Sequence, residues 1–411
     1  MQSQLEMLNR VEASEFQGDP TLTTAFHNTA RAMVEQSLNI QPGEEVLIWF
    51  DPSGLPLVKE LFHACQARNA NVSFFERNLD EDAQSIQSMT EEQIRERFTL
   101  ERQLVDNAQA ILLVRGPENP EIMMTVPKHL RTAYKNESDS VHSRRGKDLD
   151  KGGVRWCLFL WPTEYEAKKE QMSQDSYMHA YFEACNQPWR AIAEAQEVLI
   201  SKLNAGKKLE LRANQHAADP KKRTKLTMSI DSMTFCNSTI GKNYPGSEVF
   251  SAPVVDSVNG QLYAEGEYMY DGSLMKNIYL EFKDGKIIKA EAEFGNDELQ
   301  HILSQGEGAR YLGEVALGTN PGLTRRFFND LLNEKVGGSF HVAIGHCYEY
   351  TTYAGEDVNV NNGNTFDKTP VHWDLTILMN TDGMVLVDDE VIQENGCFID
   401  PALSILNPQF T

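Results

Sequence analysis

The chain has 411 residues, with 38 lysines and arginines against 60 aspartates and glutamates, so its formal net charge is −22 at pH 7. A nucleic-acid-binding protein needs a basic surface to displace counterions from phosphates, and an anionic membrane repels an acidic protein. The charge therefore excludes nucleic acid and membrane surfaces as expected partners. The length predicts two or three domains, each large enough for a core of its own.

The first half of the sequence alternates helical and strand patterns. Apolar residues recur at helical spacing over residues 22–38 and 55–68. Short apolar runs suited to buried strands occur at residues 46–50, 71–75, 110–116 and 157–162. Strands separated by helices indicate a parallel sheet, and the absence of glycine-rich phosphate loops means that the pattern does not require a nucleotide.

The pattern changes near residue 205, after a long helical stretch expected over residues 165–204. Beyond it, alternating and β-branched segments dominate, and Asp284-Gly285 predicts a two-residue hairpin turn. Helices are expected only near residues 296–306 and 322–334. We therefore predict an α/β N-terminal domain with a mainly parallel sheet over residues 1–205. A β-rich α+β C-terminal domain, which carries the candidate metal site, is predicted over residues 206–411.

The acidic charge is concentrated in the second half of the chain. Residues 241–411 contain 10 basic and 26 acidic side chains, so −16 of the net charge lies there. An acidic field raises the local concentration of divalent cations and protonated amines, although it is more often only a solvated surface.

The sequence shows no sign of export or anchoring. It lacks a basic segment followed by an apolar run at its start, and no run of about 18 apolar residues occurs. The six cysteines are dispersed without a C-x-x-C pair, which argues against a disulfide framework and a thiolate zinc site. We expect a cytoplasmic protein that binds neither membrane nor nucleic acid.

The most informative short pattern is His372-Trp373-Asp374. Side chains alternate along a strand, so His372 and Asp374 project to one face while Trp373 packs on the other. An imidazole and a carboxylate on one face can share a divalent metal, but a hydrogen-bonded His–Asp pair explains this triplet equally well.

Three further residues strengthen the metal interpretation. His341 lies in an apolar strand pattern, and Glu248 and Glu314 are each flanked by apolar residues. A glutamate that is buried without a partner costs several kcal/mol, so each needs a cation or a hydrogen-bond donor. A surface-facing glutamate is the simpler explanation for either residue alone, but it fits poorly for all of these segments together.

These segments resemble a known enzyme family. The ordered motifs GSEVFSAPV, LGEVALG, HVAIG-x-x-Y and HWD are similar to those of the two-metal aminopeptidases that include aminopeptidases T and S. The early LNIQPGEEVLIWF and the middle WCLFLWPT also resemble that family, so the resemblance covers nearly the whole chain.

The resemblance implies a set of site residues and partners. The family's metal ligands match Glu248, Glu314, His341, His372 and Asp374. Its active-site tyrosine matches Tyr348, which would ligate a metal or donate to the developing oxyanion. The family also implies a homodimer, peptide substrates with a free N-terminus, and two divalent ions per chain, which could be zinc, cobalt, manganese or magnesium.

The expected chemistry is hydrolysis. Two ions would lower the pKa of a shared water and polarise the scissile carbonyl. Glu314 is the candidate for moving the proton of that water to the leaving amine. His346 and Glu349, which flank the active-site segment, are expected not to ligate metal.

Two other functions are alternatives to peptide hydrolysis. A related mononuclear Fe(II) dioxygenase of the dihydroxypyridine-cleaving type would need only His341, His372 and Asp374. The presence of both Glu248 and Glu314 favours two metals and hydrolysis instead. A catalytically silent peptide-binding protein is disfavoured because the ligand set is intact.

Overall fold

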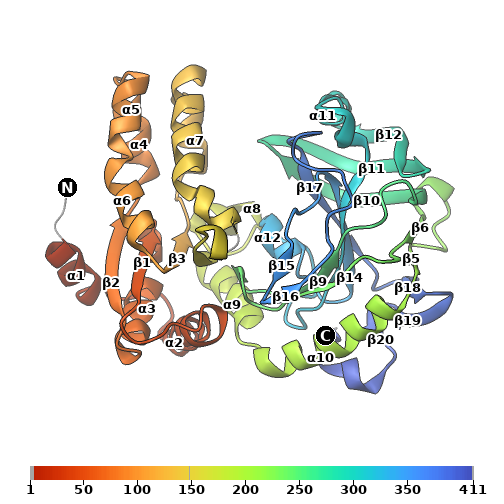
Figure 1. Cartoon of the computed structure of the whole chain (residues 1–411), viewed down its shortest axis with the longest axis horizontal. Coiled ribbons are helices and arrows are strands. Elements are labelled where there is room, and N and C mark those ends of the chain that lie inside the picture. The colour runs from red at the N-terminus through yellow and green to blue at the C-terminus, as the bar shows by residue number, and fades with distance from the viewer. Residues whose placement is uncertain (1–3, 148, 410–411) are drawn as a thin grey trace. The chain divides into compact units, whose positions relative to one another are not determined.

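The computed structural model describes residues 4–147 and 149–409 and divides the chain into two compact units (Figure 1). The first contains the chain up to Asn186 together with Ile240–Pro245, and the second contains Gln187–Thr239 and the chain from Gly246 onward. Within the described ranges, no helix is long and apolar enough to cross a membrane.

The first unit is built on a parallel five-stranded sheet, which confirms the predicted α/β class. Its strand order is β2 (Asn71–Glu76), β1 (Glu45–Phe50), β3 (Ala110–Arg115), β4 (Arg155–Leu160) and β8 (Asn243–Tyr244). Every neighbouring pair is parallel. Five of the six residues of β1 are buried, as expected of a central strand covered on both faces.

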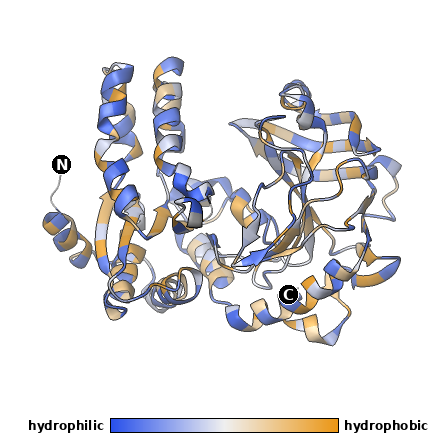
Figure 2. Cartoon of the chain, in the orientation of Figure 1, coloured by the Kyte–Doolittle hydropathy of each residue, from blue (hydrophilic) through white to orange (hydrophobic). Residues whose placement is uncertain are grey.

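Helices account for most of the rest of this unit, and polar residues alternate with hydrophobic ones along them (Figure 2). Asn78 caps one of them through its side chain, and Thr90 and Gln93 form a capping box at the next. The helices are α1 (Gln4–Glu12), α2 (Leu22–Ala32), α3 (Leu55–Ala67), α4 (Leu79–Ile86), α5 (Glu91–Arg97), α6 (Thr99–Asn107), α7 (Lys128–His142), α8 (Glu164–Lys169) and α9 (Gln174–Cys185).

The second unit is rich in antiparallel strands, as predicted. Its larger sheet has the order β12 (Lys286–Phe294), β11 (Ser273–Lys283), β10 (Asn259–Tyr270), β6 (Thr224–Ser229), β5 (Lys208–Ala213), β18 (Met384–Val387), β19 (Glu390–Glu394) and β20 (Cys397–Phe398). The predicted hairpin joins β11 to β12 through Asp284 and Gly285, whose φ angles are 48° and 80°. A hairpin turn of this kind needs positive φ at both central residues.

The smaller sheet of the second unit carries the candidate site residues. Its order is β17 (His372–Leu378), β14 (Ser339–Gly345), β13 (Leu312–Gly318), β9 (Glu248–Ser251) and β7 (Cys236–Ser238). Every residue of β9, β13 and β14 is buried. Tyr268 of β10 donates its hydroxyl to the Thr376 carbonyl of β17 at 2.7 Å, which connects the larger sheet to the smaller one.

Two helix predictions were partly wrong. The stretch over 165–204 is three helices, because the chain turns at Gln171, with φ 57°, and again before Pro188. The helix expected over 322–334 shrinks to α12 (Asp330–Asn333). Asn333 accepts a hydrogen bond from the Phe327 amide and donates one to the Phe327 carbonyl, and these bonds stabilise an irregular loop before α12.

The contacts divide the chain near residue 187, whereas the sequence placed the domain boundary near 205. The difference is α10 (Trp189–Ala205), which packs within the second unit. Gln196 of α10 is fully buried and donates to the hydroxyls of Ser247 and Thr319, each at 2.8 Å, and to the Glu248 carbonyl at 3.1 Å. This amide therefore ties α10 to the residue that opens β9.

Replacing Gln196 with leucine should destabilise the second unit. The side-chain volume is nearly kept, but the hydroxyl and carbonyl oxygens that bond Gln196 lose a partner, which should lower the unfolding free energy by about 2–3 kcal/mol. Urea unfolding measures the difference against Glu194→Gln, an exposed change on the same helix. A loss below about 0.5 kcal/mol would contradict the role given to this network.

Candidate metal centre

The five predicted ligand side chains project from one face of the smaller sheet. Glu314 lies opposite Ala343 on β14, and Ala343 lies opposite Asp374 on β17. Gly318, four residues after Glu314, lies opposite Glu248 on β9. Residues directly opposite one another in antiparallel strands point to the same side, and so do residues two apart along a strand. The same rule places His341 and His372 on this face.

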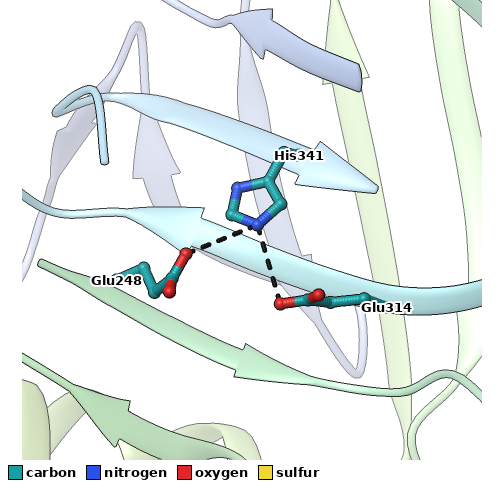
Figure 3. Close-up of side chains that lie close together, drawn as sticks. All are labelled: Glu248, Glu314 and His341. Atoms are coloured by element: carbon teal, nitrogen blue, oxygen red, sulfur yellow. Dashed lines mark ion pairs between the residues drawn. The ribbon is translucent and has the colours of Figure 1, made fainter. Parts of the chain in front are cut away.

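Glu314 occupies the middle of the cluster. Its Oε1 lies 3.7 Å from His341 Nε2, and its Oε2 lies 3.2 Å from His372 Nε2. Glu248 Oε2 lies 3.5 Å from His341 Nε2, so His341 faces two carboxylates (Figure 3). Asp374 lies 4.0 Å from each imidazole. Two overlapping groups could each hold an ion, Glu248–Glu314–His341 and Glu314–His372–Asp374.

The unpartnered atoms of the cluster fit a cation. Glu248 Oε2, His372 Nε2 and Asp374 Oδ1 are buried, yet none has a hydrogen-bond partner among the described residues. His372 Nδ1 lies 2.7 Å from the His346 carbonyl, to which it donates, so in the neutral imidazole the lone pair of Nε2 is directed at the carboxylates. A lone pair that faces carboxylate oxygens needs a positive charge between them. Carboxylate and imidazole ligands together suit zinc, cobalt or manganese.

The pKa values of the cluster also indicate that it needs a positive charge. Burial lowers the pKa of His341, but the surrounding carboxylates outweigh this effect and raise it to about 9. Burial raises the pKa of Glu314, but the two imidazoles lower it to about 2. Burial is also the main cause of the raised pKa of Asp374, about 6. Without another cation, protons on the imidazoles balance the carboxylates.

Sequence reasoning missed a buried cation beside the cluster. Lys335 is 1% exposed, and its Nζ lies 2.6 Å from Glu248 Oε1 and 2.6 Å from Glu334 Oε2. Burial lowers the pKa of Lys335, but these two carboxylates raise it above its usual value. Lys335 uses one oxygen of Glu248 and leaves Oε2 for another cation. One feature of the sequence could have indicated this cation. Glu334 and Lys335 stand shortly before the apolar strand segment that contains His341.

Tyr348 lies beside His372, with ring centroids 5.2 Å apart, and packs against Phe250 and Tyr350. Burial, reinforced by nearby carboxylates such as Glu314, raises its pKa well above the usual value. The phenol therefore keeps its proton and can act as a hydrogen-bond donor.

The flanking residues that were expected not to ligate metal have other contacts. His346 Nδ1 lies 3.1 Å from the Cys347 carbonyl oxygen, and the His346 carbonyl oxygen accepts from His372. Glu349 is exposed and accepts a hydrogen bond from the Phe366 amide at 3.1 Å. Neither side chain belongs to the two groups that could hold an ion.

Comparison with known proteins identifies relatives over most of the chain. Aminopeptidase 2 of Geobacillus stearothermophilus is 26% identical over an alignment of 371 positions, and the match covers 82% of this chain and 86% of that protein. Aminopeptidase PepS of Streptococcus thermophilus is 24% identical over 404 residues, 89% of this chain and 95% of that protein. Aminopeptidase T of Thermus thermophilus is 34% identical over 154 residues, 34% of this chain and 36% of that protein.

A solved structure has the same fold. Wild-type AmpT from Thermus thermophilus superposes with a TM-score of 0.72 at 20% sequence identity, covering 92% of this chain and 100% of that one. The sequence model of the family described as thermophilic metalloprotease (M29) matches residues 23–396. The chain therefore belongs to the M29 family of metalloproteases.

Proposed function

We propose that this M29 metalloprotease is an aminopeptidase that removes N-terminal residues from peptides with the help of two divalent ions. The observation that carries the proposal is the pair of overlapping ligand groups that share Glu314. The relatives with long matches to this chain are aminopeptidases, which supports the choice of reaction. We further propose, from the resemblance, that the enzyme is a homodimer in the cytoplasm and acts on peptides with a free N-terminus.

One ion would be held by Glu248, Glu314 and His341, and the other by Glu314, His372 and Asp374. When bound, such ions lower the pKa of a water and polarise the scissile carbonyl. The His346 carbonyl fixes the orientation of His372, and Lys335 limits Glu248 to one free oxygen. Tyr348, as a protonated phenol, would donate a hydrogen bond to the oxygen on which negative charge develops.

Glu334 is a better candidate than Glu314 for the residue that moves a proton from the attacking water to the leaving amine. Both oxygens of Glu314 face imidazoles, so both would be used to bind the metal ions and neither would be free to accept a proton. Glu334 belongs to neither ligand group, yet it lies close enough to raise the pKa of Asp374. Burial raises the pKa of Glu334 itself, as suits a carboxylate that takes a proton and returns it to the leaving amine.

The proposed activity is tested by metal analysis together with hydrolysis. Purified protein should contain two divalent ions per chain and release leucine from Leu-peptides but not from their N-acetylated forms. Removing the ions with a chelator should abolish release, and adding back zinc, cobalt, manganese or magnesium should restore it. One iron per chain, with oxygen consumption and no amino acid release, would instead identify the dioxygenase; peptide binding without turnover at full metal content would identify a silent binder.

Two classes of variant should separate metal ligation from proton transfer. Glu314→Gln and His372→Ala each remove a ligand, so metal content should fall and kcat/KM should drop by about 10³-fold or more. Glu334→Gln should keep both ions while kcat drops by about 10²–10⁴-fold. Glu349→Gln, an exposed change near the site, is the matched control. Near-normal turnover of the ligand variants with saturating metal would contradict the site, and metal loss in Glu334→Gln would make that residue a ligand.

Lys335→Met should destabilise the metal-free protein. Without the ammonium, the buried Glu248 and the partly buried Glu334 lose the cation that they share, which lowers the unfolding free energy by about 3–5 kcal/mol. Added zinc or manganese should recover part of the loss, because a bound ion supplies positive charge to Glu248. Thermal unfolding with and without metal measures both effects, with the exposed Lys283→Met as control. Equal stability of the two variants would show that Lys335 does not balance these carboxylates.

A further inference from the structure

A polar cavity of about 570 Å³ lies in the first unit, separate from the candidate metal ligands, which all belong to the second. It is bounded by α1, by the carboxyl end of β2, and by α4, α5 and α6. In sheets of parallel strands, ligands bind outside the carboxyl ends of the strands. The charged side chains that line it are Arg10, Arg77, Arg97, Glu76, Glu81, Asp82 and Glu101.

Glu101 is the unusual residue of this cavity. It lines the cavity from α6 and is only 4% exposed, yet its Oε2 has no hydrogen-bond partner among the described residues. Burial raises its pKa to about 7, despite the nearby guanidinium groups of Arg77 and Arg97. A buried carboxylate oxygen without a donor is energetically unfavourable, and a ligand that donates a hydrogen bond to it would remove that cost.

The neighbouring carboxylate explains why Glu101 Oε2 has no hydrogen-bond donor among the described residues. Asp82 is 2% exposed and accepts hydrogen bonds from Arg77, Arg97 and the Tyr134 hydroxyl. The buried donors therefore converge on Asp82. The two guanidinium groups lie close enough to Glu101 to lower its pKa, but no described residue donates a hydrogen bond to its Oε2.

The cavity also presents positive charge to a ligand. The Arg97 side chain is 33% exposed, and it contacts Asp82 through Nη2. The Arg10 side chain is 38% exposed and contacts Glu76 through Nη1. A guanidinium carries five N–H donors in a planar fork that matches a carboxylate, so each arginine has donors beyond these bonds.

We propose that this cavity binds a small zwitterion, an α-amino acid with an apolar side chain. Its ammonium group would donate to Glu101 Oε2, and its carboxylate would accept from Arg97 and Arg10. The apolar side chain would lie against Met7, Phe74 and Leu100, which line the same cavity. A polyanion such as a phosphate ester fits poorly, because four acidic side chains line the cavity, Glu76, Glu81, Asp82 and Glu101. A simple cation fits poorly because three arginines line it as well.

Calorimetric titration of the full-length, metal-loaded protein with L-leucine tests the proposal. 3-Methylbutylamine lacks the carboxylate and N-acetyl-leucine lacks the ammonium, so both should bind at least tenfold more weakly than leucine. Glu101→Gln should weaken leucine binding at least tenfold without loss of thermal stability, because it removes an unpaired buried charge. Glu96→Gln, an exposed change on α5, should leave binding unchanged.

The metal site could itself bind a free amino acid, and a second variant separates the two sites. Leucine binding that survives His372→Ala and is lost in Glu101→Gln supports the cavity, whether or not the proposed peptidase activity holds. Binding that is lost in His372→Ala and kept in Glu101→Gln assigns the ligand to the metal site and overturns the proposal. Equal binding of leucine and 3-methylbutylamine, or no binding of leucine, overturns it as well.

Discussion

Buried negative charge on one face of a small antiparallel sheet is the constraint on which the candidate centre depends. Glu248 and Glu314 are 6% and 2% exposed, and Asp374 lies beside them. Removing a carboxylate from water costs several kcal/mol unless positive charge accompanies it. Lys335 supplies that charge to only one oxygen of Glu248. The remaining carboxylate oxygens need protons or metal ions, so ion binding and the stability of this sheet are thermodynamically linked.

Strand register is what converts separate sequence segments into one cluster. A one-residue slip of β14 or β17 would turn its imidazole to the opposite face of the sheet. Ala343 lies between Glu314 and Asp374 in the sheet. Its side chain is small, so it leaves space on this face for the carboxylates on either side. A side chain at Gly313 would place its Cβ 2.1 Å from the His346 carbonyl oxygen, which orients His372. Glycine at this position therefore preserves the contact that fixes the imidazole.

The parts of the structure that were predictable from sequence are those that depend on local periodicity. The strands around His341 and His372 and the α/β alternation of the first unit follow from patterns of two and of about four residues. The partnership of Lys335 with Glu248 joins residues 87 positions apart, and no local pattern specifies it. The sequence placed α10 in the N-terminal domain, whereas its contacts group it with the second unit, because the buried partners of Gln196 lie far along the chain.

The acidic excess of the second half must be separated from the charge of the cluster. Residues 241–411 carry a net −16, but much of it lies on exposed strands and turns, such as Asp388, Asp389 and Glu390. At physiological ionic strength, exposed charges more than about 8 Å away are largely screened. Salt screens the buried Glu248 and Glu314 much less, and the partly buried Asp374 lies beside them, so the attraction of the cluster for a cation depends less on salt. Retention of ions by the cluster therefore depends on a few desolvated carboxylates, and the wider acidic surface contributes mainly to solubility.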